Sequence, residues 1–279
     1  MKKVIKFLVL VFVIVGLWAS VASAHQPKMV TGESVVVTDP EISKAYYGEL
    51  KGVPDIFFIS ATEPFDLYVN VLVPDIEGQK KDVSAVVLQN GKQLVVLDGM
   101  NYEWKEFFEP FGQDNYFMGP EYKAQAPRGE YEIRVWSSNN DSKYALAIGE
   151  IEKFGRKEGL ESLKTVLALK SDFFGKSRAG LIFSSIGYGM IVALYVLALV
   201  VFFVSRVVVK KFSHGAPNKA NKNVGKKDRL LRLVIGLALL VFAITTSWNP
   251  ILIFISGLVL CTAVFSWCGL YSLLGKNTC

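Results

Sequence analysis

Two cysteines near the end of the chain are the residues whose chemistry is easiest to specify. Cys268 and Cys279 follow a third cysteine, Cys261, which lies inside an apolar run. Two thiols at a membrane surface can form a redox pair, carry sulfur, or hold a metal ion if a second chain adds ligands. Alternatively, they are small apolar residues at the end of a helix. The sequence leaves both possibilities open for Cys268 and Cys279, whereas Cys261 is expected only to pack.

Histidine is scarce, and this limits other catalytic chemistry. The chain has two histidines, His25 and His214, and residues 25–178 contain no cysteine. A Ser-His-Asp triad, a thiol nucleophile or a zinc site of the usual ligands therefore cannot be assembled within this segment. We expect a protein that is not an enzyme and that needs no cofactor or metal ion.

Apolar stretches at three places predict how the chain meets a membrane. Residues 1–24 have a lysine-rich start, an apolar middle and an Ala-Ser-Ala end, which together are typical of a secretory signal peptide; an uncleaved anchor is the alternative. Residues 179–205 carry no charge and are long enough for one transmembrane helix. Residues 233–275 also carry no charge, but a polar cluster ending in Pro250 interrupts them. They predict a helical hairpin over residues 230–279.

The two ends of this hairpin carry a motif. Its first part is Asn-Val-Gly-x-x-Asp-Arg-x-x-Arg at 223–232, and its second is Cys-x-x-Tyr-x-x-x-Gly-x-Asn-Thr-Cys at 268–279. Both parts, at this separation, resemble the ends of the YgaP-like transmembrane domain family, a two-span module of unknown function. The residues that match are Asn223, Gly225, Asp228, Arg229, Arg232, Cys268, Tyr271, Gly275, Asn277, Thr278 and Cys279. The resemblance implies membrane insertion and self-association. Some relatives carry a rhodanese domain, which nothing in this chain resembles.

The distribution of charge predicts how the chain is oriented in the membrane. Residues 25–178 contain 18 basic and 24 acidic residues, whereas residues 206–232 contain nine basic residues and one acidic residue. Because basic loops stay in the cytoplasm, the linker at 206–229 is expected inside and the segment after the signal peptide outside. Both motif ends, and the C-terminus, then lie on the cytoplasmic face. The linker has a single aromatic residue and no recognisable nucleic-acid-binding fold, so we expect no nucleic-acid partner.

Short apolar runs separated by turn signals predict an antiparallel β-sandwich over residues 25–155. Asn90-Gly91 lies between two such runs and predicts a hairpin. Residues 156–178 change to helical spacing and predict an amphipathic helix, which either lies on the bilayer or packs against the sandwich.

Residues 102–122 of this domain are rich in aromatic and acidic side chains. Exposed rings beside carboxylates can bind sugars or peptides, whereas buried rings would only fill the core, which is the more common use of aromatic residues. The candidate ligand surface consists of Tyr102, Trp104, Phe108, Tyr116 and Tyr122.

The main hypothesis is a multi-pass protein of the cytoplasmic, or inner, membrane that is not an enzyme and displays an acidic β-sandwich outside. Its fold is the sandwich plus three transmembrane helices. Its expected partners are the lipid bilayer, a second copy of itself, and an envelope protein or glycan. The alternative is a thiol or sulfur-relay protein, or a redox sensor, that uses Cys268 and Cys279.

Overall fold

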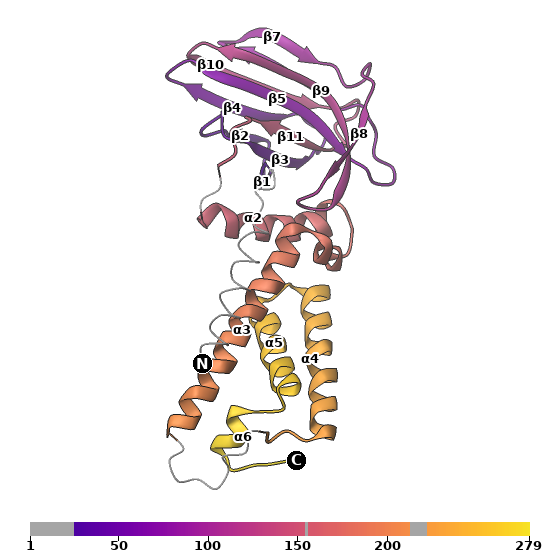
Figure 1. Ribbon diagram of the computed structural model, residues 1–279. Coiled ribbons are helices and arrows are strands. Elements are labelled where there is room, and N and C mark those ends of the chain that lie inside the picture. Colours follow the sequence, from indigo (N-terminus) through magenta and orange to yellow (C-terminus); the bar gives the residue numbers. More distant parts are fainter. Residues whose placement is uncertain (1–24, 154–155, 213–221) are drawn as a thin grey trace. The chain divides into compact units, whose positions relative to one another are not determined.

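The computed structural model describes residues 25–153, 156–212 and 222–279. Contacts divide the chain into a β-rich unit that ends at Lys176 and a helical unit that begins at Ser177 (Figure 1). The predicted signal peptide and residues 213–221 of the predicted linker lie outside the described residues.

The β-rich unit is a sandwich of two sheets. Sheet A has six strands in the order β1-β3-β11-β5-β9-β8, and sheet B has five in the order β2-β4-β10-β6-β7. The strands of sheet A are β1 (Gln26–Met29), β3 (Lys44–Glu49), β11 (Lys143–Ile148), β5 (Phe65–Pro74), β9 (Asp114–Ala126) and β8 (Lys105–Glu109). The strands of sheet B are β2 (Ser34–Val36), β4 (Asp55–Ala61), β10 (Gly129–Trp136), β6 (Ser84–Gln89) and β7 (Lys92–Leu97).

The predicted sandwich is confirmed, but it is not entirely antiparallel. Strand β1 pairs with β3 in parallel, and β2 pairs with β4 in parallel. Two parallel neighbours need a crossover between them. The chain supplies it by alternating sheets, since β2 of sheet B separates β1 from β3, and β3 of sheet A separates β2 from β4. The parallel pairs lie at one edge of each sheet.

Alternating apolar residues fill the space between the sheets. In β10, Tyr131, Ile133 and Val135 are buried while Arg134 faces outward. One core cluster joins such residues from both sheets. The predicted hairpin is also present, because Asn90 and Gly91 adopt positive φ angles of 49° and 78° between β6 and β7.

A helical segment covers part of the outer face of sheet A. Helix α2 (Arg156–Ala168) continues into a π-helical turn, η1 (Leu169–Phe173). Leu169, Phe173 and Phe174 pack against Tyr47 and Tyr116 of the sheet. The predicted amphipathic segment therefore packs against the sandwich, and residues up to Lys176 belong to that unit.

The helical unit contains η2 (Arg178–Phe183), α3 (Ser185–Phe212), α4 (Lys226–Thr246), α5 (Pro250–Val264) and α6 (Gly269–Leu273). The predicted hairpin is α4 and α5. Asn249 ends the polar break by accepting hydrogen bonds from the backbone amides of Ile251 and Leu252, and Pro250 takes the first helical position. Because α3 continues to Phe212 and α4 begins at Lys226, the predicted linker at 206–229 is too long at both ends.

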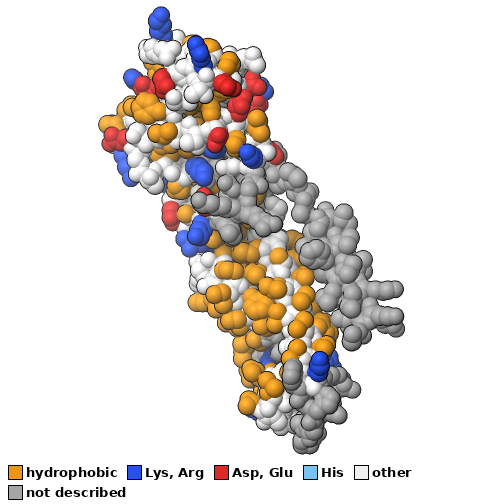
Figure 2. Space-filling model, turned by 90° about the vertical axis from the view of Figure 1, so that its left-hand side faces the viewer, with side chains coloured by type: hydrophobic (Ala, Val, Ile, Leu, Met, Phe, Trp, Pro, Cys, Tyr) orange, Lys and Arg blue, Asp and Glu red, His pale blue; other side chains and the backbone are white. Residues whose placement is uncertain are grey.

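Among the described residues, two helices are long and apolar enough to cross a membrane: α3 over Ser185–Val209, and α4. Helix α5 has 15 residues and is apolar but shorter. It packs between the other two, where Gly257 lies against Ala198 of α3 and Gly236 of α4 lies against Leu260. Figure 2 shows a broad hydrophobic surface over these helices and a mixture of acidic and basic side chains over the sandwich.

Candidate functional site

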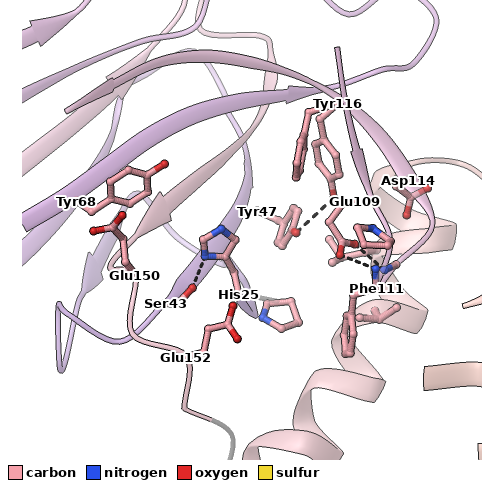
Figure 3. Close-up of a pocket in the computed structure, with 16 residues that line it drawn as sticks. His25, Ser43, Tyr47, Tyr68, Glu109, Phe111, Asp114, Tyr116, Glu150 and Glu152 are labelled. Atoms are coloured by element: carbon pink, nitrogen blue, oxygen red, sulfur yellow. Dashed lines mark hydrogen bonds between the residues drawn. The ribbon is translucent and has the colours of Figure 1, made fainter. Parts of the chain in front are cut away.

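The sandwich unit contains a cavity of about 300 Å³ on the outer side of sheet A (Figure 3). Strands β1, β3 and β5 form its floor, the β8–β9 hairpin forms one wall, and α2 with η1 contributes Val166 and Leu169. The side chains that line it are mainly aromatic or acidic. They come from Tyr47, Tyr68, Phe107, Glu109, Phe111, Asp114, Tyr116, Glu150 and Glu152, together with His25 and Ser43.

A buried ion pair fixes η1 beside this cavity. The Nζ atom of Lys170 lies 2.8 Å from Oδ1 of Asp114, and the two side chains are only 3% and 4% exposed. Lys170 also donates to the carbonyl of Gln113, and Lys176 lies 3.3 Å from the same Asp114 oxygen. A buried pair with these further hydrogen bonds determines where η1 docks, and removing one partner would leave a buried charge.

Glu109 at the end of β8 is held by the tip of the hairpin. Its carboxylate accepts hydrogen bonds from the backbone amides of Phe111 and Gly112, at 2.6 and 2.5 Å. Burial raises the pKa of the Glu109 carboxyl above its usual range, while these two amides oppose the shift. The hydroxyl of Tyr116 donates to that of Tyr47 at 3.3 Å, and burial raises the pKa of both phenols.

On the other side of the cavity, His25 contacts Ser43 through Nδ1 and the hydroxyl. Figure 3 shows Glu152 close to this pair, and Tyr68 with Glu150 farther along. Glu150 pairs with Lys123 at 2.6 Å, and Tyr68 donates to Glu121. Within the described part of the chain, no group of three His, Cys, Asp or Glu side chains is arranged to hold a metal ion.

The second candidate site lies in the helical unit, where the two ends of the sequence motif meet. Asn223 is 3% exposed. Its side-chain amide donates to the carbonyl of Cys268 and to the hydroxyl of Ser272, both at 2.9 Å. Its carbonyl oxygen accepts from the backbone amide of Cys268 at 2.8 Å. One side chain thus ties the segment before α4 to the start of α6.

The last residues of the chain also contact the segment around Asn223. The Thr278 hydroxyl accepts from the backbone amide of Gly225 at 2.9 Å and lies 3.1 Å from Oδ2 of Asp228, to which it donates. The backbone amide of Thr278 donates to the carbonyl of Asn223. A Cβ atom on Gly225 would lie 2.0 Å from the carbonyl oxygen of Thr278, so only glycine fits there. We call Asn223, Gly225, Asp228 and Thr278, with the backbone of Cys268, the terminal clasp.

Two arginines extend the clasp to the end of α5. Arg232 pairs with Asp228 at 2.8 Å and donates to the Thr262 hydroxyl at 3.0 Å, and its guanidinium lies 4.7 Å from the ring centre of Tyr271. Arg229 donates to the carbonyl of Ala263 at 2.8 Å. Asp228, Arg229 and Arg232 in the first two turns of α4 therefore each hydrogen-bond to a residue from the second half of the hairpin segment.

Residues 220–279 match the family model described as "Inner membrane protein YgaP-like, transmembrane domain". This confirms the resemblance stated from the motif, and with the apolar helices it indicates a membrane protein.

No curated protein matches the chain. Similar solved structures include the pre-peptidase C-terminal domain of a collagenase from Bacillus anthracis, at 9% identity over 45% of this chain and 95% of that chain, with a TM-score of 0.25. Another is CorA, described as a surface-associated copper-binding protein of Methylomicrobium album BG8, at 9% identity over 45% and 100% of the two chains, with a TM-score of 0.24. A beta-glucosidase from Paenibacillus barengoltzii is 12% identical over 47% of this chain and 12% of that chain, with a TM-score of 0.22.

The cysteines of the YgaP-like segment occupy different environments. Cys268 is 6% exposed, Cys279 is exposed, and both are free thiols. The clasp uses the backbone of Cys268 and not its sulfur. Cys261 lies within α5 and packs near Phe202 and Trp267. Gly275 adopts a φ of +66°, and Asn277 accepts a hydrogen bond from the backbone amide of Cys279, so these motif residues shape the turn after α6.

The five residues of the predicted ligand surface are divided among different places. Tyr116 is buried beneath η1, and Trp104 and Tyr122 pack against the core between the sheets. Tyr102 and Phe108 remain exposed. Of the five, only Tyr116 lines the cavity. Four further residues of the aromatic and acidic stretch at 102–122 also line it: Phe107, Glu109, Phe111 and Asp114. The lining residues from outside that stretch, such as His25, Tyr47 and Glu150, were not predicted from the sequence.

Proposed function

We propose that this chain is a membrane-anchored protein that is not an enzyme and that displays its β-sandwich outside the cytoplasmic membrane as a binding or assembly domain. The observation that carries the proposal is the lipid-compatible surface of α3 and α4, of which α4 belongs to the YgaP-like segment. Large apolar side chains are exposed along both helices: Val204, Val207, Val208, Leu230, Leu231, Val234, Leu237, Val241 and Phe242. Such a surface is unfavourable in water and suits a bilayer.

In this proposal the chain crosses the membrane three times. Helix α4, with 21 residues, is about 31 Å long, which matches a hydrocarbon core of about 30 Å. Helix α5 is shorter, but the clasp supports its role as the returning span. Thr278 is bonded to Gly225 and Asp228 at the start of α4, so the C-terminus belongs on the side where α4 begins. Residues between the end of α5 and α6 cover the remaining depth.

The positive-inside rule supports an orientation with the clasp in the cytoplasm. Arg206 and Lys211 lie near the end of α3, and Lys226 and Lys227 begin α4. The α4–α5 turn at the opposite end is polar and uncharged. The sandwich precedes α3, which places it outside if α3 crosses once. The expected partners there are an envelope protein or a glycan.

Self-association through the helices is part of the proposal. Gly189 on α3 has nothing within 4 Å of where a Cβ atom would lie. Glycine at a membrane helix surface lets a second helix approach closely.

Cysteine labelling tests the topology. In intact spheroplasts, a membrane-impermeant maleimide should leave Cys279 unlabelled until the membrane is opened. A second variant carries Cys279→Ser and Asn139→Cys, which places a thiol on an exposed loop of the sandwich. It should react in intact spheroplasts. Labelling of Cys279 from outside, or protection of the introduced cysteine, would overturn the proposed orientation.

A further inference from the structure

The cavity on sheet A has the size and lining of a small-molecule site. Its volume of about 300 Å³ lies at the lower end of the range of about 300–1,000 Å³ that is usual for ligand pockets. A row of rings leads along one wall: the ring centre of Phe107 lies 6.4 Å from that of Tyr116, which lies 6.5 Å from that of Tyr47. Phe111 and Tyr68 add two further rings to the lining.

The charge of the lining is strongly one-sided. Four carboxylates line the cavity, from Glu109, Asp114, Glu150 and Glu152, and the only basic side chain among the lining residues is that of His25. Two of these carboxylates have lysine partners, since Lys170 and Lys176 pair with Asp114, and Lys123 pairs with Glu150. Glu109 differs from them, because its hydrogen-bond donors are the neutral backbone amides of the hairpin tip.

Glu109 and the row of rings occupy the same side of the cavity. Figure 3 shows the Glu109 carboxylate beside Tyr47 and Tyr116. Phe107 is on the same strand as Glu109, two residues away, so both side chains project from the same face of β8. The lining therefore brings an anionic group together with ring faces, whose quadrupoles also favour positive charge.

We propose that this cavity binds a small organic ammonium ion, with Glu109 as its counter-charge and the rings of Tyr47, Phe107 and Tyr116 as its apolar walls. The proposal rests on the function given above, in which the sandwich is a binding domain, and it names the chemical class of the ligand.

Other ligand classes fit the lining less well. An anion would meet the Glu109 carboxylate, whose hydrogen-bond donors are neutral backbone amides. A neutral sugar would bury Glu109 without supplying a positive charge, which is costly for a carboxylate. A metal ion lacks a set of three ligands among the described side chains. An ammonium ion supplies the charge, and its carbon substituents match the ring faces.

The test uses titration calorimetry on the full-length protein in a maltoside detergent, because phosphocholine detergents themselves carry quaternary ammonium groups. The probes are tetramethylammonium and putrescine, with tert-butanol as a neutral analogue and acetate as an anion. At least one ammonium probe should bind saturably, and neither control compound should. Glu109→Gln should weaken that binding about tenfold or more. Glu106→Gln, on the same strand but outside the cavity lining, should leave it unchanged.

Phe107→Leu keeps the proposal testable if Glu109→Gln does not fold. Phe107 is 37% exposed, so folding depends little on its ring. Its loss should weaken tetramethylammonium binding about threefold or more. The proposal is overturned if neither ammonium probe binds, if tert-butanol binds equally well, or if Glu106→Gln weakens binding as much as the cavity variants. These outcomes would not alter maleimide labelling, so the topology proposal stands or falls separately.

Discussion

Asn223 is the residue through which the terminal clasp can be tested most directly. Replacing it by alanine removes three hydrogen bonds: two donated to the Cys268 carbonyl and the Ser272 hydroxyl, and one accepted from the Cys268 amide. The carbonyl of Cys268 keeps a partner, because the backbone amide of Ser272 also donates to it. The backbone amide of Cys268 is buried, and it loses the side-chain oxygen of Asn223 as its acceptor.

The magnitude follows from these contacts. A typical intramolecular hydrogen bond contributes about 0.5–1.5 kcal/mol, and a buried donor left without a partner costs about 1–3 kcal/mol. We therefore expect Asn223→Ala to lower the free energy of unfolding by about 2–4 kcal/mol. That range corresponds to a change of roughly 30-fold to 900-fold in the unfolding equilibrium constant.

The matched control is Asn277→Ala, in the same motif. Asn277 is exposed and accepts one hydrogen bond, from the backbone amide of Cys279. We expect a change of about 0.5 kcal/mol or less, as is usual at exposed positions. Unfolding would be followed by circular dichroism in mixed micelles during titration with sodium dodecyl sulfate. Maleimide labelling of Cys268, which is 6% exposed, supplies a second measurement, because opening of the clasp should speed it. Equal losses of stability in both variants, or unchanged labelling in Asn223→Ala, would refute the reasoning.

Three further predictions concern backbone fit and charge. Gly225→Ala should lower the melting temperature by an amount equivalent to about 1–3 kcal/mol, because its Cβ atom would meet the Thr278 carbonyl at 2.0 Å; an unchanged melting temperature would contradict the close approach. Gly269→Pro should raise stability by about 0.4–1 kcal/mol in the same unfolding titration, since residue 269 is the first of α6 and Cys268 already has φ −127° and ψ 123°, which suit a residue before proline. A loss of stability would count against that helix start. Burial raises the pKa of Glu109, so its contribution to stability is present below about pH 4.5 and is lost as the pH rises through the raised folded value. Melting temperatures measured from pH 4.5 to neutrality should fall less in Glu109→Gln than in the wild type, and equal falls would contradict this.

Periodicity predicted most of the fold because each part has a distinct period. Alternation in segments such as 131–135 placed one face of a strand in the core, and Asn90-Gly91 marked a hairpin that is present. The parallel pairing of β1 with β3, and of β2 with β4, was missed. It depends on which sheet the chain enters next and not on the local sequence pattern. The extension of α3 to Phe212 was missed because basic residues suggested a linker, although lysine and arginine are good helix formers.

The two candidate sites differed in how far the sequence could predict them. That the two motif ends lie near one another was expected, because a hairpin returns residues 268–279 to the end of the helices where residues 223–232 lie. The cavity was predicted only in part: the aromatic and acidic stretch at 102–122 marked one wall, but the contribution of α2 and η1, which dock on sheet A, was not expected. That docking uses a lysine, Lys170, paired with Asp114, which is 56 positions away in the sequence. The local signal for this docking was a lysine among the apolar residues of an amphipathic helix, and on its own it would suggest a solvated side chain.

The contacts of the clasp allow a role in anchoring to be tested separately from a role in thiol chemistry. Asn223 binds the backbone amide and carbonyl of Cys268, which every residue except proline supplies, so serine at this position would keep all of these bonds. The exposed Cys279 contributes only its backbone amide to a hydrogen bond with Asn277. Replacing both cysteines by serine should therefore preserve the fold of the YgaP-like segment while removing its terminal thiols. If a redox- or sulfur-dependent phenotype is lost in that variant, the phenotype depends on the sulfur atoms. If the phenotype persists, the role of the segment is that of an anchor, which its motif residues hold together.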